Sequence, residues 1–274
     1  MANAVLSMVT LTVQRLGDVT RWHMSSVAGR AAGVTVSAYV YRGVVVDTGF
    51  YRARRLFLDA LSRAAVRGVV VTHWHEDHAG NAERVAAQGI PLLLRADTES
   101  MLRRRPAIQL YRKIIWGRPS ALTGELIPFE AEGFECVHTP GHSPDHQVVW
   151  FPETRTLFSG DLWLGVRSRV YHVDEDPFQI VESLRRAAAL EPERMFDAHR
   201  GEVANPSAAL AARAEWLTTT LGDIERRIAA GATDAQIVRE LFRGEEAAAY
   251  VSFHEYSRRN LVRAVRRRVA PGTV

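Results

Sequence analysis

The stretch VVVTHWHEDHAG, residues 69–80, places three histidines and two acidic residues within six consecutive positions, directly behind a run of valines. Protonated histidines this close would repel one another, and neutral ones would leave their lone pairs unused. A metal ion resolves both problems, because it accepts several imidazole nitrogens and carboxylate oxygens at once. The valine run predicts a buried strand, so this motif predicts a metal site at the end of a strand.

Further candidate ligands follow other predicted strands. They occur in HTPGHSPDH (138–146), FSGD (158–161) and FDAHRGE (196–202). With the first motif, they supply seven candidate ligands: His73, His75, Asp77, His78, His142, Asp161 and His199. Seven donors are too many for one tetrahedral ion, but they fit two ions that share a carboxylate. Imidazoles and carboxylates without thiolates favour zinc, with iron and manganese as alternatives.

Asp47 and the other histidines of the chain are interpreted differently from these candidate ligands. Asp47, in VVVDTG, ends another predicted strand and is expected to orient a ligating histidine. His138 and His146 are interpreted as hydrogen-bonded structural histidines. His23, His172 and His254 have no motif around them and are assigned no role.

The composition is that of a globular protein. The chain has 274 residues, of which 47% are hydrophobic and 24% charged, enough for a large core. Its single cysteine, Cys136, excludes an internal disulfide framework. The start MANAVLSMVTLTV has no basic region, so we interpret it as a first strand and not as a signal peptide. Since no stretch approaches the ~20 apolar residues of a membrane span, we expect a cytoplasmic protein with no membrane partner.

Basic residues gather in two segments, although the formal net charge is only +4. Residues 101–118 hold six basic residues and no acid, and residues 251–274 hold six arginines and one glutamate. Such segments can bind phosphates or acidic substrates. For the second segment, solvated arginines on a helix face are the simpler interpretation. For the first, both interpretations stay open.

The order of predicted elements suggests a mixed core followed by helices. Strands are expected at 9–13, 34–41, 43–46, 69–72, 90–94, 134–138, 147–151, 156–158 and 195–198. Helices are expected at 54–64, from the first motif to residue 88, at 97–116 with a break at Pro106, and at 177–190. From Pro206 onward the pattern is purely helical. We therefore expect a catalytic domain at 1–204 and a helical C-terminal appendage at 205–274.

The motifs VVVDTG, THWHEDHAG, TPGHSPDH and FSGD, followed by the late histidine, resemble the metallo-β-lactamase superfamily in kind and order over about residues 9–204. The resemblance implies an α+β fold, a four-layer αββα sandwich with the metals at one edge of its two sheets, here with an all-helical C-terminal appendage. It also implies that His73, His75 and His142 hold the first metal. Asp77, His78 and His199 would hold the second. Asp161 would bridge the two metals, and Asp47 would orient a ligating histidine.

The expected function is a dinuclear metal-dependent hydrolase. A hydroxide held between the two ions would attack the carbonyl carbon of a small ester, thioester or lactone, and Asp77 would hold or relay a proton. The segment between the first and second histidine motifs is in a position to cover the metals. Its candidate substrate contacts are Tyr111, Arg112, Lys113 and Trp116. A surface helix that packs these aromatics inward is equally consistent with the pattern.

Several alternatives stay open. The same core could cleave RNA as an endoribonuclease of the β-lactamase-like group, with the basic segments following the backbone. A mononuclear iron sulfur dioxygenase keeps similar motifs with fewer ligands. A quorum-signal lactonase would usually carry a tyrosine shortly after the bridging aspartate, where this chain has Leu162-Trp163-Leu164. A non-catalytic binding module is disfavoured by the complete ligand set. The helical tail could pack on the core or form a homodimer.

Overall fold

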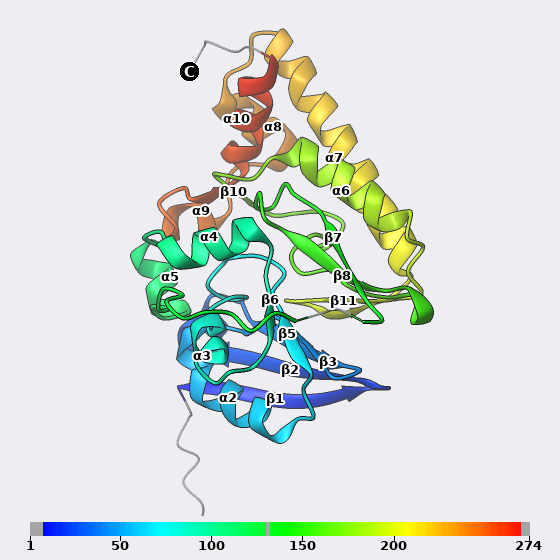
Figure 1. The fold of residues 1–274 in the computed structure, drawn as a ribbon. Helices are drawn as coiled ribbons and strands as arrows, with labels where there is room; N and C mark the ends of the chain where they lie inside the picture. The colour runs from blue at the N-terminus through cyan, green and yellow to red at the C-terminus, as the bar shows by residue number, and fades with distance from the viewer. Residues whose placement is uncertain (1–7, 130–131, 270–274) are drawn as a thin grey trace, which may run out of the picture.

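The structure is a computed structural model that describes residues 8–129 and 132–269, and most of its strands form two stacked sheets (Figure 1). The first sheet has six strands in sequential order. Neighbours from β1 to β4 are antiparallel, whereas β4, β5 and β6 run parallel. The strands are β1 (Val9–Leu16), β2 (Val19–Ser26), β3 (Val36–Tyr41), β4 (Val44–Val46), β5 (Gly68–Val70) and β6 (Leu92–Leu93).

The second sheet has five strands in the order β12-β11-β9-β8-β7. Strands β9 and β11 run parallel, and the other neighbours are antiparallel. The strands are β7 (Glu135–His138), β8 (Gln147–Phe151), β9 (Thr156–Phe158), β11 (Arg194–Asp197) and β12 (Gly201–Val203). The parallel strands of each sheet end at a common edge, so the loops that follow them lie close together.

The inner layer is the apolar contact between the two sheets. Because side chains alternate along a strand, Tyr39 and Tyr41 of β3 both face the second sheet. Their rings contact Phe158 and Phe151, with centroids 5.4 and 4.8 Å apart. Val70 of β5 belongs to the same cluster, whereas its neighbours in sequence face the other side of the sheet.

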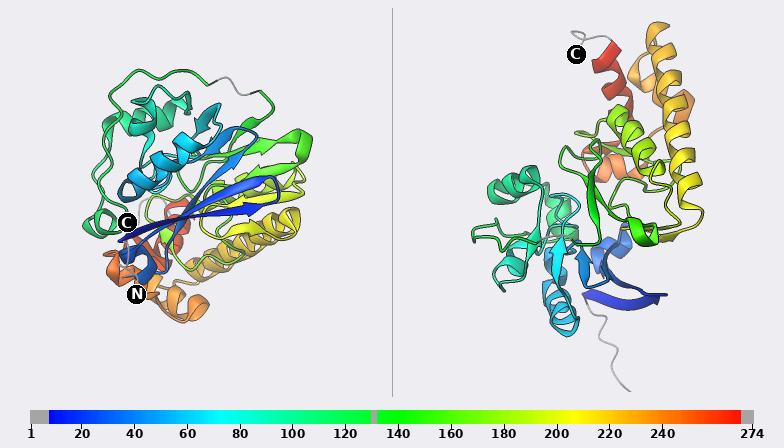
Figure 2. Two further views of the ribbon diagram at one scale, coloured as in Figure 1. Left: turned by 90° about the horizontal axis from the view of Figure 1, so that it is seen from below. Right: turned by 45° about the vertical axis from the view of Figure 1, so that its right-hand side comes forward.

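Helices cover the outer face of each sheet (Figures 1 and 2). Phe57 of α2 and Val85 of α3 pack with Val69 on the first sheet, and Leu184 of α6 packs with Trp150 on the second. These helices are α2 (Arg54–Arg63), α3 (Ala82–Ala86) and α6 (Pro177–Ala188), and a short α1 (Val27–Ala31) follows β2. The four layers confirm the αββα sandwich that the sequence predicts.

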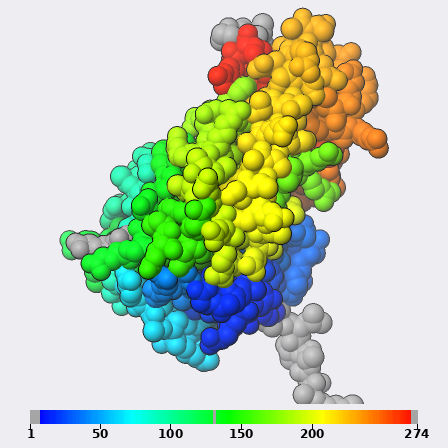
Figure 3. Space-filling view, turned by 90° about the vertical axis from the view of Figure 1, so that its right-hand side faces the viewer, coloured from blue at the N-terminus to red at the C-terminus, as the bar shows by residue number. Residues whose placement is uncertain are grey.

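The C-terminal helices share the core of the second sheet. The long helix α7 lies beside α6 along one face of the molecule (Figure 3). Leu217 and Leu221 of α7, Ile237 of α8 and Val262 of α10 belong to the same buried cluster as the outer face of the second sheet. The helices are α7 (Pro206–Ala229), α8 (Asp234–Phe242), α9 (Ala247–Val251) and α10 (Arg258–Val269). The division at residues 204 and 205 stays a prediction, and the hydrophobic core crosses it.

The structure adds elements that were not predicted, among them β2 and β13, and it divides one predicted helical region in two. Strand β2 is absent from the predicted strands, because polar residues separate its apolar Trp22 and Met24. The segment predicted as purely helical contains a two-residue strand, β13 (Tyr256–Ser257), which pairs with β10 (Tyr171–His172). The helical region at 97–116 is two helices, α4 (Ala96–Arg104) and α5 (Leu110–Ile115), and so confirms the break at Pro106.

Two points complete the description. Residues 1–7, at the start of the segment interpreted as a first strand, lie outside the described residues. Within the described ranges, every helix is either too short or too polar to cross a bilayer.

Candidate metal centre

Five loops that follow strands meet at one edge of the sandwich. Asp47 follows β4, the motif 73–78 follows β5, His142 follows β7, Asp161 follows β9, and His199 follows β11. Parallel β4 and β5 bring the first two loops together, and parallel β9 and β11 bring the last two together. The fold therefore brings together side chains that lie more than 150 positions apart in the sequence.

Tight packing of the backbone fixes the first two loops against each other. The Thr48 N–H donates to the carbonyl of His78, and the Gly80 N–H donates to that of Gly49, at 2.7 and 3.0 Å. A Cβ on Gly80 would lie 2.3 Å from the carbonyl oxygen of Glu76, which explains glycine at this position. The loop that carries the histidines is thus pressed onto the turn that carries Asp47.

The seven predicted ligands form two adjoining groups. In the first, His75 Nδ1 lies 3.0 Å from both His73 Nε2 and His142 Nε2. In the second, Asp77 Oδ2 lies 3.8 Å from His78 Nε2 and 3.7 Å from His199 Nε2. Each group places its ligand atoms within 4.8 Å of one another. Either group has the size and chemistry of a metal site.

Asp161 lies between the two groups. Its Oδ1 is 3.2 Å from His78 Nε2 and 3.1 Å from His199 Nε2, and its Oδ2 is 3.3 Å from His142 Nε2. This is the position expected of a carboxylate shared by two ions. The structure therefore brings all seven predicted residues together, while their role as ligands stays a prediction.

The donor set fits metal ions by its hydrogen bonding as well. His78 Nε2 and Asp161 Oδ1 are buried, and neither makes a hydrogen bond within the described residues. Buried polar atoms are nearly always satisfied, so two such atoms 3.2 Å apart are unusual. Lone pairs directed at a shared ion would account for both.

The outward nitrogens of four histidines are held by partners that determine which nitrogen faces inward. Nδ1–H of His78 donates to Asp47 at 2.8 Å, that of His142 to Glu175 at 2.7 Å, and that of His199 to the Thr35 carbonyl at 2.5 Å. His73 Nδ1 lies 3.0 Å from Thr72 Oγ1. In each case Nε2 faces the centre, as it must in a histidine that ligates a metal there.

Asp47 therefore has the orienting position that the sequence predicts. Besides His78, its carboxylate accepts from the backbone N–H of Thr72 at 2.8 Å and from the Thr72 hydroxyl at 2.9 Å. Asp47 has a φ of 66°, which is uncommon for a non-glycine residue. The local strain is offset by a carboxylate that ties two ligand-bearing loops together.

Charges within the centre divide the histidines into two kinds. Burial and the nearby histidines lower the pKa of His73 and of His75 well below the usual range, which favours the neutral imidazole that a metal requires. Burial also opposes protonation of His78 and His199, but Asp161 and the other carboxylates raise the pKa of His78 and bring that of His199 to about 9. Positive charge is thus favoured beside Asp161, where a cation would be held.

The other histidines near the site are structural. His146 accepts the Asp161 N–H at Nε2, 3.0 Å away, and its Nδ1 lies 2.9 Å from Thr139 Oγ1. Burial lowers the pKa of His146 to about 3, so it stays neutral. His138 Nε2 donates to the Pro144 carbonyl. Both findings agree with the interpretation from sequence.

The predicted substrate residues lie in less open surroundings than expected. Trp116 is buried against Phe50, and the Tyr111 hydroxyl donates to Glu255. Arg112 is buried and ion-paired, so the substrate contact predicted for it has no support from its environment. Lys113 lines a surface pocket, and its predicted contact stays a prediction.

Arg112 instead links the C-terminal segment to the metal-ligand loop. Its guanidinium binds both oxygens of Glu76, at 2.5 and 2.6 Å, and also lies 3.2 Å from Glu255. Glu76 stands between the ligands His75 and Asp77. Sequence reasoning missed this network, since Arg112 and Glu255 are 143 positions apart and lie in no recognisable motif.

Residues 32–199 of the chain match the family model of the metallo-beta-lactamase superfamily. The matched region contains all seven candidate ligands and Asp47. The chain belongs to the metallo-beta-lactamase superfamily.

Among curated proteins, the chain is similar to "Beta-lactamase-like protein 2 homolog" of Drosophila melanogaster, with 31% identity over 60% of this chain and 57% of the relative. It is also similar to "Atrochrysone carboxyl ACP thioesterase" of Aspergillus fumigatus, with 31% identity over 54% of this chain and 44% of the relative. The chain thus spans about half the length of the curated relatives it matches.

Solved structures share the fold at low sequence identity. A metallo-beta-lactamase family protein from Thermus thermophilus covers 97% of this chain and 94% of its own, with a TM-score of 0.61 and 18% identity. A metallo-beta-lactamase from Pseudomonas aeruginosa in its mono-zinc form covers 76% of this chain and 95% of its own, with a TM-score of 0.57 and 20% identity. These matches support the sandwich.

Proposed function

We propose that this protein is a two-metal hydrolase that cleaves an acyl thioester. The observation that carries the proposal is the position of Asp161, within 3.4 Å of nitrogens from both groups of candidate ligands. One shared carboxylate with three further ligands on each side is the arrangement that two divalent ions need.

Zinc suits these residues best. His73, His75 and His142 would hold one ion, Asp77, His78 and His199 the other, and Asp161 would contact both. Five imidazoles and two carboxylates without a thiolate match zinc, with iron and manganese as alternatives. When bound at such a site, two divalent ions polarise a carbonyl oxygen and make hydroxide available at neutral pH.

The chain's own residues would orient the metal ligands and protonate the leaving group. Asp47, Glu175 and the Thr35 carbonyl hold three ligating imidazoles in place, which limits reorganisation during the reaction. Asp77 remains the candidate for holding or relaying a proton to the leaving group. Its side chain and that of His199 are 12% and 22% exposed, whereas His73 is fully buried. Substrate would therefore approach from the side of Asp77 and His199.

A thioester is favoured over other carbonyl compounds by the relatives. The relative from Aspergillus fumigatus is named a thioesterase of an acyl carrier protein, and its match to this chain exceeds 30% identity. A thiolate is also a better leaving group than an alkoxide, so it depends less on proton transfer from Asp77 when it departs. We expect esters and lactones to be poorer substrates of the same centre.

The two alternatives are less well supported by the contacts. Arg258 and Arg266 of the tail bind carboxylates and backbone carbonyls of their own segment, which leaves them less free to follow an RNA backbone. A mononuclear iron dioxygenase would leave the group of Asp77, His78 and His199 without a purpose. Both alternatives, and a homodimer through the tail, remain predictions.

Metal analysis and a substrate panel test the proposal together. We expect two zinc-type ions per chain and turnover of an N-acetylcysteamine thioester, with weaker turnover of a lactone and none of a β-lactam or of single-stranded RNA. The Asp77→Asn variant should lose thioester turnover. Cleavage of RNA without thioester turnover would establish the nuclease instead, and one iron without any hydrolysis would establish the dioxygenase.

A further inference from the structure

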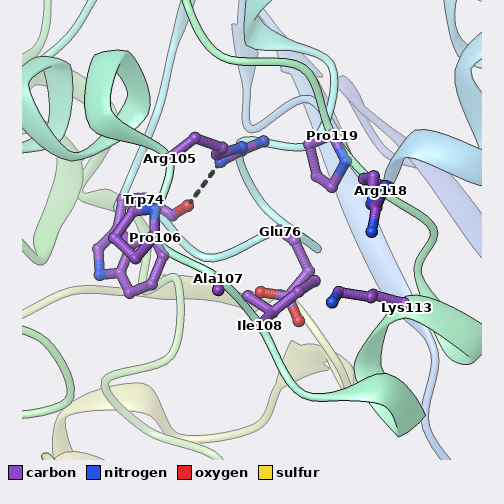
Figure 4. Close-up of a pocket in the computed structure, with 9 residues that line it drawn as sticks. All are labelled: Trp74, Glu76, Arg105, Pro106, Ala107, Ile108, Lys113, Arg118 and Pro119. Carbon is purple, nitrogen blue, oxygen red and sulfur yellow. Dashed lines mark hydrogen bonds between the residues drawn. The ribbon is translucent and has the colours of Figure 1, made fainter.

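A pocket of about 270 Å³ lies beside the loop that carries the metal ligands (Figure 4). Its floor includes Trp74 and Glu76, which alternate along the loop with His73, His75 and Asp77. Apolar walls come from residues 106–108 and Pro119. The site described above uses neither the pocket nor most of its side chains.

The pocket gathers the side chains of three cationic residues. Arg105, Lys113 and Arg118 line it, and within the described part of the chain no carboxylate oxygen lies within 4.0 Å of their charged nitrogens. The one acid in the lining, Glu76, is already paired with the buried Arg112. The pocket therefore carries an excess of positive charge that an anion would balance.

Arg105 is held in place for such a contact. It ends α4 in a left-handed conformation, with a φ of 45°. Its Nη1 and Nη2 donate to the carbonyls of Trp74 and Ala79 at 3.4 and 3.3 Å, while its Nε is buried and has no hydrogen-bond partner among the described residues. These backbone contacts fix the position of the Arg105 charge at the pocket, where it adds to the charges of Lys113 and Arg118 and favours an anionic ligand.

The size and chemistry of the pocket select the ligand class. Its volume lies just below the ~300–1,000 Å³ of sites for drug-sized ligands, so it suits one portion of a molecule. Guanidinium groups bind phosphate through paired N–H donors, and three clustered cations match a phosphate dianion better than a carboxylate.

We propose that this pocket binds a phosphate group. If the proposed function holds, that phosphate belongs to the carrier portion of the thioester, as in coenzyme A or phosphopantetheine. If it does not, the phosphate belongs to a separate ligand that contacts the metal-ligand loop from the side of Trp74 and Glu76. The first source rests on the proposed function, and the second does not.

Direct binding tests the pocket itself. Inorganic phosphate is titrated into the metal-loaded protein by calorimetry, and into the Lys113→Gln/Arg118→Gln variant, whose two side chains hold no element of the fold. We expect about tenfold weaker binding in the variant, since two charge-assisted contacts are lost. The Arg105→Gln variant should behave likewise. Arg55→Gln, an exposed arginine of α2 outside the pocket, should bind as the unchanged protein does. Equal binding by all four proteins, or no binding by any, overturns the proposal.

Kinetics distinguish the two sources of phosphate. Acetyl-coenzyme A and the N-acetylcysteamine thioester of acetate share the acyl group but differ in phosphate. A KM raised about tenfold in Lys113→Gln/Arg118→Gln for the first substrate alone, with kcat kept, assigns the phosphate to the substrate. Weaker phosphate binding with both KM values unchanged assigns it to a separate ligand and retains the site. If the unchanged protein hydrolyses neither thioester, the proposed function fails and the calorimetry alone decides on the pocket.

Discussion

The buried ion pair between Arg112 and Glu76 permits a quantitative prediction for the Arg112→Met variant. Methionine approximates the length of the arginine stem but removes the charge and its donors. Glu76 is only 2% exposed, and both its carboxylate oxygens bind this guanidinium. The substitution therefore leaves a buried carboxylate without the cation that binds both its oxygens.

The expected loss of stability is large. Removing one partner of a buried ion pair costs about 3–5 kcal/mol, mostly because the remaining charge is stranded away from water. The lost contact between Arg112 and Glu255 contributes less to the destabilisation, because Glu255 keeps hydrogen bonds from Tyr111 and His172. A loss of this size is a substantial share of the ~5–15 kcal/mol that stabilise a typical native protein.

Urea unfolding of metal-loaded protein measures the effect. We expect the free energy of unfolding of Arg112→Met to fall by about 3–5 kcal/mol. The double variant Glu76→Gln/Arg112→Met has no buried charge at this place and should recover much of the loss. The reasoning is refuted if the single variant is as stable as the unchanged protein, or if the double variant is the less stable of the two.

Three further predictions concern the supports of the site and the tail. In Glu175→Gln, the imidazole of His142 loses its charged partner, and zinc affinity measured by chelator competition should fall about 10–100-fold; unchanged affinity would show that Glu175 does not orient the ligand. Burial alone would raise the pKa of Glu255, but hydrogen bonds led by that from His172 lower it to about 2. The ionised form therefore stabilises the fold above pH ~4.5, and this contribution, about 1–2 kcal/mol after solvent screening, is lost as the pH falls toward 2. When the free energy of unfolding of metal-free Glu255→Gln is measured against pH, this loss should be absent. A pH profile identical to that of the unchanged protein would refute the prediction. Leu221→Ala should lower the free energy of unfolding by about 2–5 kcal/mol in one transition, whereas a separate early transition would show that the tail folds independently.

The ligands of the centre could be predicted from sequence because the fold keeps them in recognisable places. Each follows a strand, and histidines so close together as in residues 73–78 have few explanations other than a metal. The same holds for Asp47, which directly follows β4 and accepts a hydrogen bond from His78 Nδ1. Strong local patterns were sufficient for these residues.

The supports of the centre could not be predicted in that way. The partner of His199 is the Thr35 backbone carbonyl, which any residue would supply and no side chain signals. Glu175 lies in a loop with Asp174 and Asp176, and only the folded chain shows which of the three faces His142. Tertiary contacts, and not local pattern, select such residues.

The basic segments show the same limit. A count of charges describes residues 101–118 as one basic segment, but in the folded chain their side chains have different surroundings. Arg112 is buried in ion pairs, Arg103 pairs with Glu99, and Arg105 and Lys113 line the pocket. Pairing between distant residues such as Arg112 and Glu255 depends on how α5 meets the C-terminal segment, which sequence periodicity does not encode.

The most direct test of the two-metal centre is the metal stoichiometry of the protein and of its Asp161→Ala variant by native mass spectrometry. Asp174→Ala, an exposed acid near the site, serves as the control. The shared position of Asp161 predicts two zinc-type ions in the unchanged protein and in the control, and at most one tightly held ion in Asp161→Ala. Two ions retained by Asp161→Ala, or a single ion in the unchanged protein, would contradict the bridging role and the two-metal hydrolase that depends on it.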